Sequence, residues 1–268
     1  MEHRIILGLD ISTHCTGISV VYADENNNLK PIVVTHLRPK IPTKIKGIEA
    51  SFLKCDLFME KLKEILIENK LFNDKEGIRE SLITDVVIEE PLLSSNNQYT
   101  VATLLRYNGM VAHLVYKMLG IIPTFISSYD ARMYGVPSLM AVRKYNKKGE
   151  AYDEKKVKSA INKNELVLFG AYPFDCAKKL ILWNYVSEKF PDIKWVYDKN
   201  DELKDENFDA SDSLICVMGY VNKLKYDGTR PEVVCMSADE TQTEKTFTYS
   251  YKFCGEHFTK KINFPRAL

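Results

Sequence analysis

Hydrophobic and polar positions at the start of the chain alternate in blocks that predict three consecutive β-strands. Residues 5–9 form an apolar run that ends in Asp10, and a run this apolar is typical of a strand buried on both faces. Two further β-rich runs follow at residues 18–23 and 31–37, with a polar, asparagine-rich stretch between them. We therefore expect three antiparallel strands joined by tight turns.

Farther along the chain the apolar spacing changes to three or four residues, which predicts helices. The expected helices cover residues 46–69, 96–119, 153–163, 175–189 and 208–226, and a short helix is expected from residue 128. Between them, β-branched runs predict strands at residues 83–88 and 121–126. Three strands followed by alternating helices and strands predict an α/β protein with a mixed sheet and helices on both faces.

The C-terminal residues differ from the rest of the chain, because they contain strand-like runs and no helical pattern. Runs at residues 233–236 and 246–251 predict strands. We expect one domain over residues 1–228 and a β-rich extension over residues 229–268. The extension could cover a sheet edge or contact a partner, and both alternatives stay open.

The composition is that of an ordinary soluble globular protein, with 45% hydrophobic and 27% charged residues. No apolar stretch approaches the roughly 18–20 residues that span a bilayer, and no secretory signal is found before the first strand. The six cysteines are scattered without a Cys-x-x-Cys pair, so neither a zinc site nor a disulfide framework is expected. We therefore expect a protein of the reducing cytoplasm that is not secreted and does not bind membranes.

The net charge is only +1, but the charges are unevenly distributed. Residues 132–189 contain twelve Lys or Arg against six Asp or Glu, whereas residues 190–212 contain three Lys against eight acids. A basic segment beside an acidic one suits a site that binds a polyanion and holds cations nearby. For either segment alone, ordinary solvated loops are the better interpretation.

Four acidic side chains stand at the ends of expected elements. Asp10 ends the first strand, Glu89 or Glu90 ends the fourth, and Asp209 and Asp212 open the last helix. Each has an ordinary alternative as a strand-end charge or a helix cap. If the sheet places the first and fourth strands side by side, the acids converge and need a cation. Oxygen ligands without His or Cys favour Mg²⁺ or Mn²⁺, and two such ions suit phosphodiester hydrolysis.

Three motifs together give a resemblance to a known family. They are Gly-Leu-Asp10 with Thr16-Gly17, Val-Ile-Glu89, and Asp209-Ala-Ser-Asp212-Ser-Leu. In order and spacing, over roughly residues 4–226, they resemble the RuvC family of Holliday-junction resolvases. The resemblance implies a ribonuclease-H-like fold and a homodimer that nicks two opposed strands of a four-way DNA junction. It also implies that four carboxylates, those of Asp10, Glu89, Asp209 and Asp212, bind two Mg²⁺ ions, for which Mn²⁺ can substitute.

The choice between the two neighbouring glutamates follows from strand geometry and the resemblance together. Successive strand residues face opposite sides of a sheet, so only one of Glu89 and Glu90 can share a pocket with Asp10. The family match selects Glu89 and leaves Glu90 as the alternate. The expected reaction is in-line attack by water that leaves 5′-phosphate and 3′-hydroxyl ends.

Basic residues between the third and last motifs are the expected DNA contacts. Residues 169–179 resemble the family's glycine-and-lysine stretch, so Lys178 or Lys179 would contact a phosphate near the metal ions. An exposed helix lysine is an equally good interpretation of either one. The lysines expected to follow the DNA backbone, besides these two, are Lys144, Lys147, Lys148, Lys155 and Lys156.

The chain departs from the family pattern in three places. Ile-Ser-Thr follows Asp10, where the bacterial family usually has Pro-Gly-Ser, and residues 127–207 form a longer region than usual. Leu92 stands near the place of the aromatic wedge that enters the junction, and Tyr99 is the nearest aromatic residue that could replace it. These insertions, with frequent Lys, Asn and Ile, favour a viral or phage origin and hence a virus-infected or prokaryotic cell.

Three rival functions stay open at this point. A sugar-kinase or actin-like ATPase opens with a similar Asp and Thr-Gly turn, but it needs a second phosphate loop and an adenosine motif, and neither is found. We therefore expect no nucleotide cofactor. A nuclease of the same superfamily could prefer forks, flaps or RNA–DNA hybrids. An inactive DNA-binding module would not need all four acids.

Overall fold

A computed structural model describes most of the chain and shows a mixed α/β protein. The described residues are 3–75, 78–91, 97–170, 172, 176–241 and 243–265. Within them, a five-stranded central sheet is accompanied by one three-stranded and two two-stranded sheets.

The central sheet has the predicted mixture of strand directions. Its strands are β1 (Arg4–Ile11), β2 (Thr16–Ala23), β3 (Leu29–Leu37), β6 (Asp85–Glu89) and β7 (Thr124–Ile126). They lie in the order β3-β2-β1-β6-β7, in which β1, β2 and β3 are antiparallel neighbours and β6 and β7 continue parallel to β1. This is the ribonuclease-H-like sheet, so the predicted fold class is confirmed.

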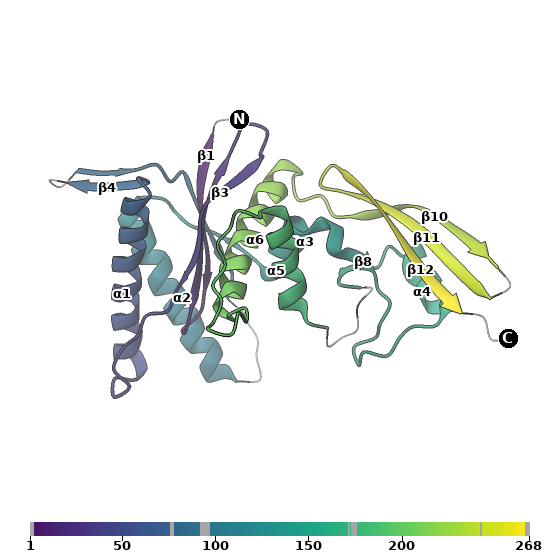
Figure 1. Ribbon diagram of the computed structural model, residues 1–268, viewed down its shortest axis with the longest axis horizontal. Coiled ribbons are helices and arrows are strands. Elements are labelled where there is room, and N and C mark those ends of the chain that lie inside the picture. Colours follow the sequence, from purple (N-terminus) through teal and green to yellow (C-terminus); the bar gives the residue numbers. More distant parts are fainter. Residues whose placement is uncertain are drawn as a thin grey trace.

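Helices cover both faces of this sheet (Figure 1). The helices α1 (Gly47–Glu68) and α2 (Gln98–Leu119) lie on one side, and α3 (Ser128–Gly135), α5 (Lys178–Lys189) and α6 (Glu206–Lys225) lie on the other. Alternate residues of β1 serve the two cores, because successive strand side chains point to opposite faces. Leu7 packs in the core with Phe58 of α1, whereas Ile6 packs in the core with Leu214 of α6.

Helix α6 lies unusually close to the sheet, and two glycines make this possible. A Cβ atom on Gly17 would lie 1.9 Å from the backbone oxygen of Asp209. A Cβ atom on Gly8 would lie 2.4 Å from Cγ2 of Val217. The glycines in the first two strands therefore determine how deeply the last helix packs onto the sheet.

Several short elements were not predicted. They are the hairpin β4 (Phe72–Lys75) and β5 (Ile78–Ser81), the 3₁₀ turn η1 (Pro137–Leu139), and the strand pair β8 (Met140–Val142) and β9 (Leu166–Leu168). Helix α4 (Glu154–Asn162) occurs where a lysine-rich helix was expected. The basic segment 145–149 forms a turn in which the Asn146 side chain accepts from the backbone N–H groups of Lys148 and Glu150.

The C-terminal residues form a sheet of their own at the end of the molecule away from α1 and α2 (Figure 1). Its antiparallel strands are β10 (Glu232–Glu240), β11 (Glu244–Phe253) and β12 (Glu256–Pro265). Phe247, Tyr249 and Tyr251 point inward from β11 and share a core with Met133 and Val142. The third strand, β12, was missed because Lys260 stands between Phe258 and Ile262, where the alternation calls for an apolar residue.

Two positions stand out within the long helices α1 and α2. Nothing lies within 4 Å of the place where a Cβ atom on Gly109 would stand. Phe52, an apolar residue of α1, is 57% exposed. No helix in the described ranges combines the length and the apolar character that crossing a bilayer requires.

Replacing Gly17 with alanine is expected to lower the free energy of unfolding by about 1–3 kcal/mol or more, because the new methyl group overlaps the Asp209 carbonyl. Gly109→Ala is the matched control. It should raise the free energy of unfolding by roughly 0.5–1 kcal/mol, since Gly109 lies in a helix with open space beside it. Urea unfolding followed by circular dichroism measures both. A Gly17→Ala protein as stable as the wild type would contradict the close packing.

Candidate active site

Two of the predicted acids lie side by side at the end of the central parallel strands. In the pairing of β1 with β6, Leu9 is aligned with Ile88, and the next residues along the two strands are Asp10 and Glu89. Parallel neighbours end at the same sheet edge, so both carboxylates emerge there. Glu90 is exposed, and its backbone N–H donates to the carbonyl of Ile126 at 2.8 Å.

The other two acids come from helix α6. The helix begins at Glu206 with Asp205 as its N-cap, so Asp209 and Asp212 lie in its first and second turns. The alternative of Asp209 as the cap is therefore wrong. The spacing of three residues places both carboxylates on one face, and the contact at Gly17 holds this part of the helix against the strands.

Burial and mutual repulsion act together on these carboxylates. The pKa of Asp10 is raised well above its usual range by burial and by the negative charges of Glu89, Asp212 and Asp209. Burial, followed by repulsion from Asp212, raises the pKa of Glu89 to about 7. Burial also raises the pKa of Asp212. The structure thus brings all four predicted acids into one electrostatically coupled cluster.

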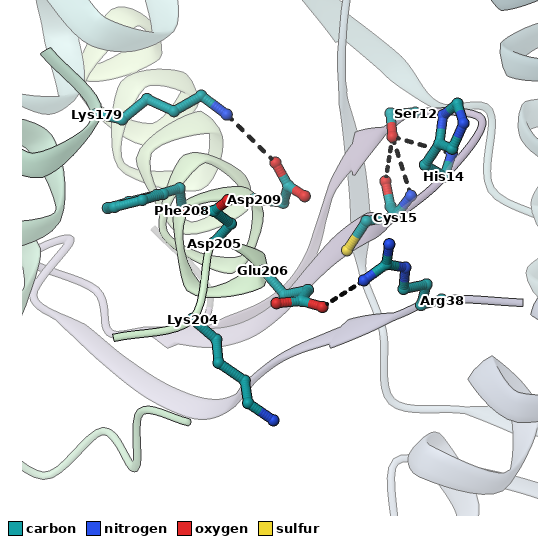
Figure 2. A pocket seen from close by; sticks show the side chains of 10 residues that line it. All are labelled: Ser12, His14, Cys15, Arg38, Lys179, Lys204, Asp205, Glu206, Phe208 and Asp209. Carbon is teal, nitrogen blue, oxygen red and sulfur yellow. Dashed lines mark hydrogen bonds and ion pairs between the residues drawn. The ribbon is translucent and has the colours of Figure 1, made fainter. Parts of the chain in front are cut away.

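Two basic side chains lie against this cluster. Nη2 of Arg132, on helix α3, lies 3.4 Å from Oδ2 of Asp212. Nζ of Lys179, at the start of α5, lies 3.7 Å from Oδ1 of Asp209 (Figure 2). Both cations oppose the rise in the pKa of Asp212. Sequence reasoning missed Arg132, because a single arginine in a short helix belongs to no motif.

Two buried thiols also touch the acids. Sγ of Cys216 lies 3.8 Å from Oε2 of Glu89, and the Cys15 thiol forms a hydrogen bond with the Asp209 side chain. Burial, with the neighbouring carboxylates, raises the pKa of both thiols. Both thiols are therefore neutral hydrogen-bond donors that can orient the neighbouring carboxylates. The sequence alone indicates only small core residues at these two positions.

A cleft of about 450 Å³ opens beside Asp209. It lies between the turn after β1 and the start of α6, and Figure 2 shows its lining side chains. Lys179 faces Asp209 across its rim, and Arg38 forms an ion pair with Glu206 at 2.6 Å. Asp10, Glu89 and Asp212 are not on its lining, so of the four predicted acids Asp209 is the one that borders the cleft.

The donor set fits a hard divalent cation by its chemistry. As the side chains stand, no group of three or more His, Cys, Asp or Glu residues in the described part of the chain is arranged to hold a metal ion. Arg132 instead pairs with Asp212. The cluster nevertheless contains four carboxylates whose repulsion a divalent cation would relieve, and carboxylate oxygens are the ligands that Mg²⁺ and Mn²⁺ prefer.

The residues predicted to contact DNA differ in how exposed their side chains are. Lys147, Lys148, Lys155 and Lys156 are exposed, and Lys144 is half-buried. Lys178 lines a second pocket together with Lys147, whereas its neighbour Lys179 faces Asp209. Tyr99 is 75% exposed in the first turn of α2, and Leu92 lies outside the described residues.

Comparisons with known proteins find likeness in structure alone. No family model matches the chain, and no curated protein matches it. Among solved structures, RuvC of Thermus thermophilus bound to a Holliday junction substrate covers 84% of this chain and 98% of its own length, at 10% identity and a TM-score of 0.43. The yeast mitochondrial Holliday junction resolvase covers 83% of this chain and 81% of its own length, at 13% identity and a TM-score of 0.41.

A different kind of protein is also found. A Ppx/GppA family member of Aquifex aeolicus covers 98% of this chain and 51% of its own length, at 9% identity and a TM-score of 0.32. These likenesses are too distant to establish an activity.

Raising the pH is expected to destabilise the metal-free protein through Glu89. Its pKa of about 7 in the folded state exceeds the value of about 4.3 in an unfolded chain, so folding favours the protonated form. This contribution is complete below about pH 4 and is lost as the pH rises through about 7. Glu89→Gln should therefore exceed the wild type in free energy of unfolding by roughly 3–4 kcal/mol at about pH 8, and equal it at about pH 4.

Urea unfolding in EDTA at the two pH values measures this difference. Glu90→Gln is the control, because it changes an exposed glutamate one residue away and should alter stability by less than about 0.5 kcal/mol. Equal stability of the wild type and Glu89→Gln at the higher pH would contradict the raised pKa.

Proposed function

We propose that the protein is a divalent-metal-dependent endonuclease that nicks branched DNA, with the four-way junction as its substrate. One observation carries the proposal: four carboxylates from two strands and one helix meet at one sheet edge, where burial and repulsion raise the pKa values of at least Asp10 and Glu89. Such a cluster is costly unless a cation binds it. The order of the three motifs along the chain supports the same assignment.

The residues that would hold the metal ions are Asp10, Glu89, Asp209 and Asp212. When bound, Mg²⁺ or Mn²⁺ supplies Lewis-acid stabilisation of the phosphate and lowers the pKa of bound water. We propose that each active site binds two of these metal ions. The Cys216 thiol would orient Glu89 by donating to its carboxylate.

The basic side chains at the cluster would act on the phosphate. Lys179 has an exposed side chain beside Asp209, so its ammonium group can reach a phosphate held at the cleft. Arg132 is fixed on α3 next to Asp212 and can place its guanidinium group at the same phosphate. Both would neutralise the negative charge that grows as water attacks the phosphorus.

Cutting two opposed strands of a junction needs two active sites, so we propose a homodimer. Light scattering on the purified protein measures its mass and so tests whether it is a dimer.

The basic residues between Arg132 and Lys189 would follow the DNA backbone, and Tyr99, exposed at the start of α2, would act as the wedge at the branch.

Mg²⁺-dependent nicking of a synthetic four-way junction is the expected activity. Four single substitutions should each reduce the rate at least about 100-fold, because each removes a negatively charged carboxylate that would hold the metal ions. They are Asp10→Asn, Glu89→Gln, Asp209→Asn and Asp212→Asn. Glu90→Gln should cut like the wild type. The measurement is cleavage of labelled junction, fork, flap, linear duplex and RNA–DNA hybrid in Mg²⁺ or EDTA.

The pattern of substrates decides the assignment. Paired, symmetric cuts on the junction would support a resolvase. Cleavage of forks, flaps or hybrids alone would keep the metal site and reject the junction as substrate. No cleavage in Mg²⁺ or Mn²⁺ would reject the nuclease.

Mg²⁺ should also stabilise the folded protein without DNA. An ion that binds only the folded state raises the free energy of unfolding by about 2.7 kcal/mol at a concentration 100 times its Kd. Thermal unfolding in Mg²⁺, compared with EDTA at matched ionic strength, should show this gain in the wild type and little of it in Asp10→Asn. A midpoint that neither Mg²⁺ nor Mn²⁺ moves would contradict the metal site.

A further inference from the structure

A second pocket, of about 240 Å³, lies beside the start of helix α5. We call it the cationic-aromatic pocket, and the lining side chains that matter are Arg143, Tyr145, Lys147, Tyr172 and Lys178. None of the described residues that line it is acidic. It is small and open to solvent, which suits one phosphate with part of its attached group better than a large ligand.

Two of the three cations in this pocket lack a carboxylate partner in the part of the chain that the structure describes. These two are Arg143 and Lys147. Three cationic side chains that share one pocket repel one another, and a bound anion relieves this repulsion. The combination of a planar guanidinium group with two ammonium groups is typical of phosphate recognition.

The walls of the pocket are fixed by backbone hydrogen bonds. The Lys144 N–H donates to the Gly170 carbonyl at 2.8 Å. This hydrogen bond joins the basic turn at residues 145–149 to the loop before α5. A Cβ atom on Gly170 would lie 2.5 Å from the Ala141 carbonyl oxygen, so these two segments are in direct backbone contact. The Asn146 side chain closes the turn that carries Lys147. The backbone that carries Arg143 and Lys147 is therefore fixed before any ligand binds.

Aromatic side chains give the pocket a second kind of contact. The ring of Tyr172 packs edge-on against Phe169, with 5.9 Å between ring centres and an angle of 70°. Tyr172 is still 39% exposed, and Tyr145 lines the same pocket. An aromatic ring held at its edge and open to solvent is a platform on which a nucleobase can stack.

The position of the pocket relates it to the carboxylates. Lys178 and Lys179 are consecutive residues at the start of α5, and one lines the pocket while the other faces Asp209. Adjacent Cα atoms are only about 3.8 Å apart. Because consecutive helix side chains point about 100° apart, the pocket and the carboxylate cluster lie on adjoining sides of the start of α5. A strand whose phosphate lies at the cluster would therefore continue toward the pocket.

We propose that the cationic-aromatic pocket binds one unpaired nucleotide, with its phosphate at Arg143, Lys147 and Lys178 and its base stacked on Tyr172. A base can stack on a side chain only when it has left the duplex, so the pocket would favour strands that open at a branch. The proposal rests on the proposed function for one point only, namely that the nucleotide belongs to the DNA that is cut.

The test is binding of labelled DNA in EDTA, which does not depend on cleavage. Fluorescence anisotropy compares single-stranded DNA, a four-way junction and a linear duplex. Tyr172→Ala should weaken binding of the single strand and the junction at least about fivefold, the lower end of base–aromatic stacking, and change duplex binding by less than about twofold. Arg143→Gln should weaken single-strand binding and reduce its salt dependence by about one phosphate contact.

Matched controls separate these effects from general changes. Tyr197→Ala removes another exposed tyrosine, and Lys199→Gln removes an exposed positive charge outside both the pocket and the basic segment 132–189. Both should bind DNA like the wild type. Tyr172→Phe keeps the ring and should restore binding, and unchanged thermal midpoints would show that the variants fold.

Free dTMP as a competitor distinguishes the two sources of a nucleotide. If dTMP binds the wild type but not Tyr172→Ala and no DNA binds, the pocket is correct and the nuclease proposal fails. If Tyr172→Ala and Arg143→Gln bind every DNA like their controls, or lose single strand and duplex equally, the pocket proposal is wrong. Mg²⁺-dependent nicking by the wild type in that case would leave the proposed function intact.

Discussion

The closeness of helix α6 to the central sheet is the constraint on which the rest of the site depends. Gly8 and Gly17 carry no side chains at the points of contact, and a Cβ atom at Gly17 would overlap the backbone of Asp209. Because the helix lies this low, the acids of its first two turns reach the acids at the ends of β1 and β6. A larger residue in either strand would lift the helix and separate the two pairs. The backbone packing therefore sets the geometry of the carboxylates.

Placing four acids together is unfavourable, and the fold offsets this cost in two ways. Arg132 and Lys179 approach the cluster from α3 and α5, so each α6 carboxylate has a cationic neighbour. The two strand acids, in contrast, are held mainly as buried groups with raised pKa values. The hydrophobic cores on both sides of the sheet keep these groups in place even though they repel one another. Such a strained arrangement is expected where a cation completes the site.

The sequence allowed most of the fold to be predicted, because the apolar period separates strands from helices and an acid at a strand end is a visible signal. Asp10 could be paired with Glu89 or Glu90 once the first and fourth predicted strands were taken as neighbours in the sheet, and the choice of Glu89 needed the family resemblance. Arg132 could not be found, because its role depends on how α3 packs beside α6 and not on its neighbours in sequence. The different directions of Lys178 and Lys179 depend on where α5 begins, and helix boundaries are set by loop geometry that no periodicity reveals.

The C-terminal sheet, for which the sequence suggested no definite role, supports the region that carries the basic turn. The Tyr249 hydroxyl accepts from the backbone N–H of Val142, and the Tyr251 hydroxyl donates to the carbonyls of Pro137 and Met140. Buried backbone groups need such partners, and phenylalanine at position 249 would remove the hydroxyl that accepts from the Val142 N–H. Val142 directly precedes Arg143, whose side chain lines the cationic-aromatic pocket. The strands at the far end of the molecule thereby fix one wall of a pocket that lies beside the carboxylates.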